Sequence, residues 1–328
     1  DGLYTAPTDE ALRSDIEPVV RLVEEAAQGL LRQPAQASPK FFYDVLGSRL
    51  FDAITELEAY YPTRTEALVF DTQGAAMAEA VRACLGRPPV LVELGAGNCS
   101  KASRLFALLQ ARAYVAVDIS VEFLRQSLLN LQLQHPEMDL AGVGLDFSAS
   151  LDLPADLPVL DSGPRLLFYP GSSIGNFAPD EALRLLRDMH QLAAGGALLI
   201  GVDLIKSSAL LEAAYDDELG VTAAFNLNLL LHLNRVLGSD FRPADWRHVA
   251  CFNAVESRIE MHLEARRALV VSWPGGQRRF SAGERLHTEN SYKWTPAGFE
   301  SLLQRAGFGS VQTWCDPKGW FAVCLASG

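Results

Sequence analysis

The apolar residues of this chain recur in two alternating patterns, which predict strands and helices in turn. Short, nearly continuous apolar runs, typical of strands buried on both faces, occur at 90–94, 114–118, 141–145, 166–169 and 197–204. Segments with apolar positions at helical spacing lie between them, at 100–109, 121–134 and 179–193. This alternation predicts an α/β fold in which helices connect the strands of a parallel sheet.

The end of the chain departs from this alternation. Thr295-Pro296 predicts the start of a last helix, at 296–306, and two further strands follow at 311–315 and 320–326. The stretch Asp316-Pro-Lys-Gly between them has turn residues, so we predict an antiparallel hairpin at the tail of the five-stranded parallel sheet.

Two helices are predicted ahead of the first strand. Ser14 and Glu17 form a capping box, which predicts a helix from Ser14 to about residue 31. Thr63 and Glu66 form a second capping box, which predicts a helix to about residue 85.

The pattern changes again after Lys206, which predicts a second domain. Helical stretches at 207–216 and 222–237 precede alternating segments near 250–263 and 267–273, as expected for a mixed α+β insert. We therefore predict one domain formed by 65–206 and 293–328, and a second formed by 1–64 and 207–292.

Composition narrows the class of protein. The chain has 328 residues, of which 49% are hydrophobic, and this is enough to bury a large core. Its net charge of −12 argues against a nucleic-acid partner, which needs a basic face. No apolar run is long enough to cross a membrane, the five cysteines form no CxxC pair, and the six histidines show no metal-site spacing. We predict a cytoplasmic, monomeric enzyme without a metal.

A glycine turn after the first predicted strand marks the candidate ligand site. Gly95-Ala-Gly97 follows 90–94, and Asp118 ends the second strand about twenty positions later, where an acid can bind ribose hydroxyls. A dinucleotide site usually has a third glycine, but this chain has Ser100 there, followed by Lys101. Asp146 after the third strand adds a second acid, which is also typical of a plain turn at the end of a strand.

These residues favour S-adenosylmethionine as the ligand. It carries adenosine and a sulfonium but no phosphate, which suits two acids and no phosphate-binding turn. A hairpin at the tail of the sheet is also found in S-adenosylmethionine enzymes of the Rossmann type, whereas dehydrogenases usually lack it. In an open parallel sheet the reacting groups gather at the switch point beside the first and fourth strands. Gly171, Ser173 and Asn176 follow the fourth strand and are expected there.

Several segments together resemble one family, the L-histidine Nα-methyltransferases of ergothioneine biosynthesis. The matching stretches are FFYDVLGSRLFDAI, YYPTRTEA, ELGAGNCSK, YVAVDIS, GLDF, YPGSSIGNF, AYDDELGVTAAFN, RIEMHL and LHTENSYKW, from about residue 40 to the C-terminus. The resemblance implies a Rossmann-like class I methyltransferase sheet with a C-terminal antiparallel hairpin, interrupted by a second, α+β substrate-binding domain.

The resemblance also implies a role for individual residues. S-adenosylmethionine would be bound by Gly95, Lys101, Asp118, Asp146 and Phe147. The α-carboxylate of L-histidine would be bound by Asn176 and Tyr215, and its α-amine would face Gly171 and Ser173 with Tyr43 nearby. Tyr60, Glu289 and Ser291 would bind the imidazole, while Phe51 and Met261 would form the pocket wall.

The implied reaction is threefold methylation of the α-amine of L-histidine to hercynine. We expect a carboxylate clamp of neutral donors, Asn176 and Tyr215, with no Lys or Arg added. One alternative keeps the reaction but changes the substrate to tyrosine or tryptophan. Others are a nicotinamide-dependent dehydrogenase that uses the same glycine turn, and a non-catalytic ligand-binding protein. Glu289 and Met261 also have plain structural explanations, as a surface acid before a helix and as a core residue.

Overall fold

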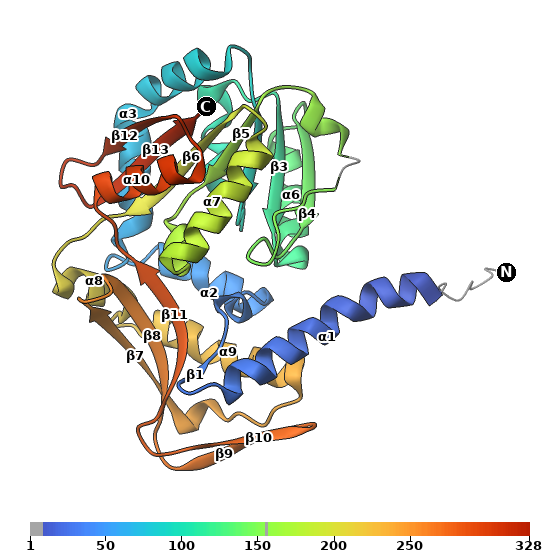
Figure 1. Ribbon diagram of the computed structural model, residues 1–328, viewed down its shortest axis with the longest axis vertical. Helices are drawn as coiled ribbons and strands as arrows, with labels where there is room; N and C mark the ends of the chain where they lie inside the picture. Colours follow the sequence, from blue (N-terminus) through green and yellow to red (C-terminus); the bar gives the residue numbers. More distant parts are fainter. Residues whose placement is uncertain (1–8, 155–156) are drawn as a thin grey trace. The chain divides into compact units, whose positions relative to one another are not determined.

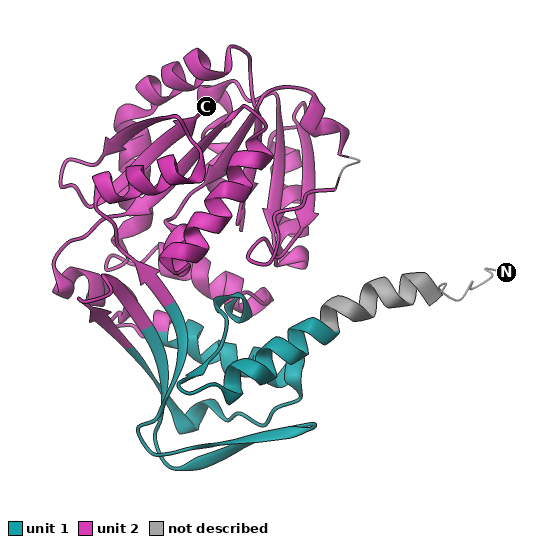
Figure 2. Cartoon of the chain, viewed as in Figure 1, with its two compact units in different colours: residues 1–42, 223–249, 261–289 teal, residues 43–222, 250–260, 290–328 magenta. Residues whose placement is uncertain are grey.

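The computed structural model describes residues 9–154 and 157–328, with side chains from residue 20 onward. Two compact units can be distinguished (Figure 2). Unit 1 comprises the described part of Asp1–Phe42 with Ala223–Val249 and Met261–Glu289, and unit 2 comprises Tyr43–Thr222, Ala250–Glu260 and Asn290–Gly328. These boundaries differ from the predicted 65–206 with 293–328 and 1–64 with 207–292. The assignment of the cofactor to one domain and the substrate to the other therefore stays a prediction.

Unit 2 is built on a seven-stranded sheet in the order β12-β13-β6-β5-β2-β3-β4 (Figure 1). Its strands are β2 (Val90–Leu94), β3 (Ala113–Asp118), β4 (Asp139–Gly144), β5 (Arg165–Tyr169), β6 (Ala197–Asp203), β12 (Ser310–Cys315) and β13 (Phe321–Ser327). The first five of these along the chain pair in parallel, and β13 pairs antiparallel with both β6 and β12. The predicted Rossmann-like sheet with a C-terminal hairpin is confirmed, including the adjacency of β2 and β5 that forms the switch point.

Helices cover both faces of this sheet because its strands are apolar on both faces. One face packs on α3 (Tyr61–Leu85), α4 (Ser100–Ser103), α5 (Phe106–Leu109) and α6 (Val121–Gln134). The other packs on α7 (Pro179–Ala193) and α10 (Pro296–Ala306), which lie side by side in Figure 1. Alternate residues of β2 go to opposite cores, Leu91 to the first and Val92 to the second.

The remaining elements are shorter. Unit 2 also contains α2 (Val45–Thr55), α8 (Ser208–Tyr215) and the 3-10 turns η2 (Pro158–Asp161) and η3 (Ser173–Asn176). Unit 1 contains α1 (Asp9–Leu31), β1 (Ala35–Gln36), η1 (Pro39–Phe42), η4 (Pro243–Asp245) and the hairpin of β9 (Leu269–Trp273) and β10 (Gly276–Phe280). Both units contribute residues to α9 (Val221–Leu237), β7 (Trp246–Asn253), β8 (Arg258–Ala265) and β11 (Arg285–Tyr292). Strands β1, β11, β8 and β7 form a second sheet in that order.

The core of unit 1 is aromatic. Phe42 stacks on Phe225 of α9 with ring centroids 4.5 Å apart, and His232 of the same helix bonds the carbonyl of Phe41 through Nδ1. Trp246 packs edge-on against Phe280 of β10 at 4.9 Å. These large buried rings fix α9 and the β9–β10 hairpin within the unit.

Several predicted boundaries were wrong. Helix α1 begins at Asp9 rather than Ser14, because Asp9-Glu-Ala-Leu-Arg are mostly good helix formers that extend it. Helix α3 begins at Tyr61, with Pro62 at its first turn, so Thr63 does not cap it. The single helix predicted at 100–109 is two short helices, α4 and α5.

One strand escaped the sequence pattern entirely. β11 reads Arg-Leu-His-Thr-Glu-Asn-Ser-Tyr, which is too polar to show the alternation of a half-buried strand. It lies in the interior of the second sheet, between β1 and β8, and most of its polar side chains are buried. Glu289 is therefore a buried strand residue, and its interpretation as a surface acid before a helix is wrong.

Candidate active site

The carboxyl ends of the parallel strands bring the candidate residues to one edge of the sheet. Following the sheet order β6, β5, β2, β3 and β4, this edge presents Asp203, Gly171, Gly95, Asp118 and Asp146. The five positions span more than a hundred residues of sequence and meet because parallel strands all end on the same side.

The turn after β2 is held by the end of β3. Gly95 and Gly97 have φ of +70° and +53°, which residues with a side chain rarely adopt. Asp118 accepts hydrogen bonds from the amides of Gly97 and Ser120 at 2.9 and 2.8 Å. Burial nevertheless raises the pKa of Asp118, since those bonds offset only part of the desolvation. Asp118 thus fixes the turn and retains lone pairs for a further donor.

Phe147 packs close to this turn. A Cβ placed on Gly95 would lie 3.8 Å from the Phe147 ring, and that ring packs edge-on against Tyr169 of β5 at 5.8 Å. Asp146 caps its own turn by accepting from the Ser148 amide at 3.1 Å. Asp146 is therefore a turn residue as well as a candidate ligand residue.

Glu66 of α3 connects the turn after β2 to the loop after β5. Its side chain is 3% exposed, and it accepts from Lys101 Nζ at 2.6 Å and from the Gly171 amide at 2.7 Å. Gly171 has a φ of +76°, which favours glycine, and a Cβ there would lie 2.9 Å from Lys101 Nζ. Two residues predicted for different ligands, Lys101 and Gly171, share one carboxylate.

Four aromatic residues form a continuous series in unit 2. Tyr43 packs edge-on against Phe51 at 5.9 Å, Phe51 against Tyr60 at 6.2 Å, and Tyr60 against Tyr215 at 6.1 Å. The structure thus brings together four of the residues predicted to contact the substrate, from the Tyr43 segment, α2, the start of α3, and α8.

The series continues into a buried polar network. The Tyr215 hydroxyl bonds Ser291 Oγ at 2.7 Å, and Lys293 Nζ donates to Ser291 Oγ at 2.8 Å and to the Tyr215 hydroxyl at 3.2 Å. Lys293 also pairs with Asp203 Oδ2 at 2.8 Å. The carboxylate clamp of neutral donors stays a prediction, and a lysine ammonium contacts one of its two members, Tyr215, directly.

Asp203 is the hub of this network. It accepts from the Tyr61 hydroxyl at 2.6 Å and from Lys206 Nζ at 2.5 Å, and its own amide donates to Ser172 Oγ at 2.8 Å. Although burial alone would raise it, Lys293 and Lys206 hold the pKa of Asp203 below its ordinary value. Burial lowers the pKa of Lys206 to about 8.

The other predicted substrate residues are placed as follows. Ser173 and Asn176 begin and end η3 and are half-buried, and the Ser173 hydroxyl donates to the carbonyl of Pro170 at 3.2 Å. Met261 and Glu289 belong to unit 1, where both are buried, and the carbonyl of Met261 accepts from the hydroxyl of Thr288 at 3.0 Å. The assignment of these residues to a substrate stays a prediction.

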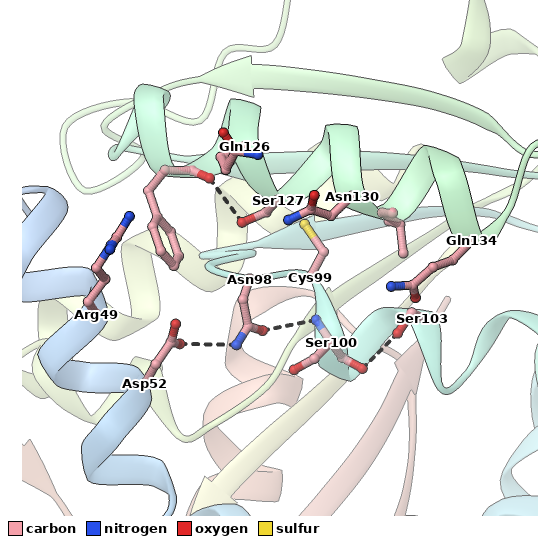
Figure 3. A pocket seen from close by; sticks show the side chains of 12 residues that line it. Arg49, Asp52, Asn98, Cys99, Ser100, Ser103, Gln126, Ser127, Asn130 and Gln134 are labelled. Atoms are coloured by element: carbon pink, nitrogen blue, oxygen red, sulfur yellow. Dashed lines mark hydrogen bonds between the residues drawn. The ribbon is translucent and has the colours of Figure 1, made fainter.

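A cavity of about 500 Å³ lies beside the candidate site (Figure 3). It is lined by residues of α2, the turn before α4, and α6, including Arg49, Asp52, Asn98 and Asn130. Asn98 donates to Asp52 at 3.0 Å and accepts from the amide of Ser100 at 3.0 Å, as the dashed lines show. None of the predicted site residues lines this cavity.

Sequence reasoning did not identify Glu66, Asp203, Lys206 or Lys293 as site residues. Glu66 was interpreted as part of a capping box. Asp203 did give a signal, since an acid within the apolar segment 197–204 needs a buried partner. Glu66 and Lys293 lie within the matching stretches YYPTRTEA and LHTENSYKW.

Comparison with known proteins decides the class of enzyme. The family described as "Histidine-specific methyltransferase, SAM-dependent" matches residues 22–328. This chain belongs to that family. As a member it is an S-adenosylmethionine-dependent methyltransferase, and the dehydrogenase alternative is wrong.

Individual relatives are similar to this methyltransferase over most of its length. The histidine N-alpha-methyltransferase of Mycolicibacterium smegmatis is 37% identical, covering 97% of this chain and 95% of its own. That of Mycobacterium tuberculosis is also 37% identical, covering 93% and 94%. Ergothioneine biosynthesis protein 1 of Neurospora crassa is 28% identical, over 86% of this chain and 32% of its own.

Among the helices within residues 9–154 and 157–328, none combines sufficient length with sufficient apolar character to cross a bilayer.

Proposed function

We propose that this methyltransferase transfers three methyl groups in succession from S-adenosylmethionine to the α-amine of L-histidine, giving hercynine for ergothioneine synthesis. The observation that carries the proposal is the contact series from Tyr43 through Phe51, Tyr60 and Tyr215 to Ser291. These five residues were proposed for the substrate from sequence alone, and they lie in one continuous series. The names of the relatives, two histidine N-alpha-methyltransferases and an ergothioneine biosynthesis protein, support the same reaction.

The residues after β2 and β3 suit the methyl donor. Exposed Gly95 has no side chain to obstruct a ligand, and half-buried Asp118 has lone pairs left for ribose hydroxyls. Lys101 has further N–H donors beyond its bond to Glu66, which would bind the carboxylate at the methionine end. Asp146 and Phe147 would bind the adenine. The donor supplies a methyl group on a sulfonium, and the protein provides alignment and exclusion of water.

The substrate would be held by its three polar groups. Asn176 and Tyr215 would bind the α-carboxylate, and Gly171 and Ser173 would border the α-amine. The imidazole would be bound by Tyr60, Glu289 and Ser291, with Phe51 and Met261 as the wall of the pocket. Glu289 and Ser291 are two positions apart on β11, so their side chains leave the same face of the strand.

The reacting nitrogen must be a neutral amine, and its proton can leave to water between transfers. No strong general base is therefore required in the site. As methyl groups accumulate the nitrogen becomes a permanent cation, and the rings of Tyr43 and Phe51 would face it. Such a contact stabilises a desolvated cation by about 0.5–2 kcal/mol.

Mass spectrometry of a reaction with S-adenosylmethionine and a mixture of the twenty amino acids tests the proposal. We expect histidine alone to gain mass, by three CH₂ groups. A product from tyrosine or tryptophan would establish the alternative substrate, and addition of one or two CH₂ groups would contradict trimethylation. Binding of the donor at equilibrium without any product would indicate a non-catalytic protein.

The Glu289→Ala variant tests the imidazole site within the same assay. A buried carboxylate that accepts an imidazole N–H would lose that hydrogen bond with a substrate lacking the group, so it provides specificity. We expect kcat/KM for histidine to fall about tenfold or more, equivalent to about 1.4 kcal/mol, with little change in donor binding. An unchanged kcat/KM would remove Glu289 from the site.

A further inference from the structure

Two consecutive residues in the loop after β5 have left-handed backbone conformations. Gly171 has a φ of +76° and Ser172 a φ of +59°. Glycine adopts such a φ without strain, whereas a residue that carries a Cβ is strained by it. Strained backbone persists only where the surrounding structure holds it, and it is concentrated at functional sites. The contacts that hold Ser172 in this conformation therefore bear on the function of the loop.

The hydroxyl of Ser172 joins the loop to the end of β6. Ser172 is buried, and its Oγ accepts a hydrogen bond from the amide of Asp203 at 2.8 Å. The pairing of β5 with β6 ends at Tyr169 and Ile200, so Asp203 lies beyond the last pair of residues. Ser172 Oγ thus provides, from a side chain, an acceptor that β5 itself no longer provides. A residue without this hydroxyl would leave the buried Asp203 amide without that hydrogen bond.

Two further contacts fix the same loop, and both lie within unit 2. The Gly171 amide donates to Glu66 of α3 at 2.7 Å. At the other end of the loop the Gly175 amide donates to the Ser172 carbonyl at 2.8 Å, and a Cβ at Gly175 would lie 2.9 Å from the carbonyl oxygen of Tyr292 in β11. The loop is thus fixed by α3, β6 and β11, and of these three contacts only that with β6 uses a side chain of the loop itself.

This loop carries the residues that the proposed function assigns to the polar groups of the methyl acceptor. Gly171 and Ser173 flank Ser172 directly, and they would border the α-amine. Asn176 ends η3 and would bind the α-carboxylate. The Ser172 side chain is buried against β6, whereas Ser173 and Asn176 are half-buried. A displacement of Ser172 would therefore move the groups around the reacting nitrogen, and the rate of in-line transfer depends steeply on its alignment.

We propose that Ser172 is a positioning residue for methyl transfer, whose hydroxyl fixes the loop after β5 so that the α-amine is aligned with the methyl group of the donor. This inference rests on the proposed function. Ser172 does not contact the reacting atoms in this role, since it acts through its neighbours Gly171 and Ser173. The strain of its backbone is compensated by the hydrogen bond from Asp203, which a strain-free glycine cannot accept through a side chain.

The test compares Ser172→Ala with Ser162→Ala. Each variant removes a hydroxyl that forms a 2.8 Å hydrogen bond, with the Asp203 amide in the first and with the Val159 carbonyl in the second. Ser162 precedes the amino end of β5, so it lies at the opposite edge of the sheet from the candidate site. For both variants and the wild type, kcat with L-histidine, the Kd for S-adenosylmethionine and stability to urea are measured.

We expect Ser172→Ala to lower kcat about tenfold or more while the Kd for S-adenosylmethionine changes by less than about twofold, because alignment is lost and the donor residues are not. Ser162→Ala should retain the wild-type kcat even where it lowers stability. A wild-type kcat in Ser172→Ala, an equal decrease of kcat in both variants, or a rise in Kd as large as the fall in kcat would overturn the proposal.

Ser172→Gly separates the hydroxyl from the backbone strain, and it also provides the test if Ser172→Ala does not fold. It removes the same hydrogen bond, but glycine adopts the left-handed φ freely. We expect Ser172→Gly to withstand more urea than Ser172→Ala and yet to have a kcat that is no higher. A kcat near the wild-type value in Ser172→Gly would show that the hydroxyl is not needed for transfer, and it would overturn the inference.

The same measurements distinguish a failure of this inference from a failure of the proposed function. A wild type that methylates no amino acid would overturn both together. If the wild type methylates an amino acid other than histidine, the proposed function fails, and the same comparison with that substrate still decides the role of Ser172. An active wild type whose kcat is unaffected by Ser172→Ala would overturn this inference alone.

Discussion

At the scale of single residues, Glu66 links two groups that are predicted to contact different ligands. It is one of few buried acids of unit 2, and its two oxygens bind groups that follow different strands, the Lys101 ammonium of α4 and the Gly171 amide after β5. Because Lys101 is predicted to contact the methyl donor and Gly171 the acceptor, Glu66 would fix their separation. In-line transfer depends on this distance, since small displacements of reacting groups have large effects on rate.

The Glu66→Gln variant tests this role. Glutamine can still accept from the Gly171 amide, but its NH₂ group would face the Lys101 ammonium, which is also a donor. We expect the dissociation constant for S-adenosylmethionine, measured by calorimetry, to rise about tenfold, or about 1.4 kcal/mol. The matched control is Glu79→Gln, the same change at an exposed position of the same helix. Equal affinities in the two variants would show that Glu66 does not position Lys101.

At the scale of elements, β6 lies in the interior of the sheet, between β13 and β5, and all seven of its residues are buried. Gly201 faces α3 and β13 there. A Cβ at this position would lie 2.2 Å from Glu66 Oε1 and 3.0 Å from the Phe321 ring. The buried position of Glu66 therefore depends on a glycine 135 positions away in the sequence.

We predict that Gly201→Ala is destabilising, because neither a strand backbone nor a buried aromatic ring can move away freely. Overpacking of this kind costs about 1–3 kcal/mol, which urea unfolding would measure. Displacement of Glu66 should also weaken donor binding. Gly309→Ala is the control, since its added Cβ would meet only the Ser327 carbonyl at 3.9 Å. If the two variants are equally stable, the space at Gly201 is not limiting.

At the scale of the whole molecule, a buried acid beneath the glycine turn links stability to pH. Glu93 of β2 is 1% exposed and accepts from the Tyr114 hydroxyl of β3. Burial raises the pKa of Glu93 from 4.5 to about 8. The folded protein thus holds a proton that the unfolded chain has released between these two values. The contribution of Glu93 to stability is present below about pH 4.5 and is lost as pH rises towards 8.

We predict that Glu93→Gln removes this pH dependence. In the wild type, ionisation of Glu93 should decrease the free energy of unfolding between pH 4.5 and about 8, by up to about 1.4 kcal/mol per pH unit. Glutamine is neutral at every pH, so the slope should be reduced by that amount. Lys206 acts above this range, where its lowered pKa of about 8 makes stability increase with pH. Urea unfolding at several pH values would measure this slope for the wild type, for Glu93→Gln and for the control Glu79→Gln. Equal slopes in all three proteins would show that Glu93 is ionised in the folded protein.

The sequence by itself determined the sheet and most of its helices. The segments at 90–94, 121–134 and 179–193 match β2, α6 and α7 to the residue. Strands buried on both faces and amphipathic helices carry their own periodicity, so local pattern is sufficient. The same holds for Gly95 and Asp118, because the ends of parallel strands share one edge whatever the details of packing.

Only the tertiary structure decided which polar residues work together. Glu66 has the sequence context of a capping box, yet it binds partners 35 and 105 positions away. Lys293 pairs with Asp203 ninety positions earlier, and polar β11 becomes a strand only because β1 and β8 flank it. A buried charge is stable only where a partner and hydrogen bonds compensate its desolvation. That compensation comes from distant segments, so no local pattern could specify it.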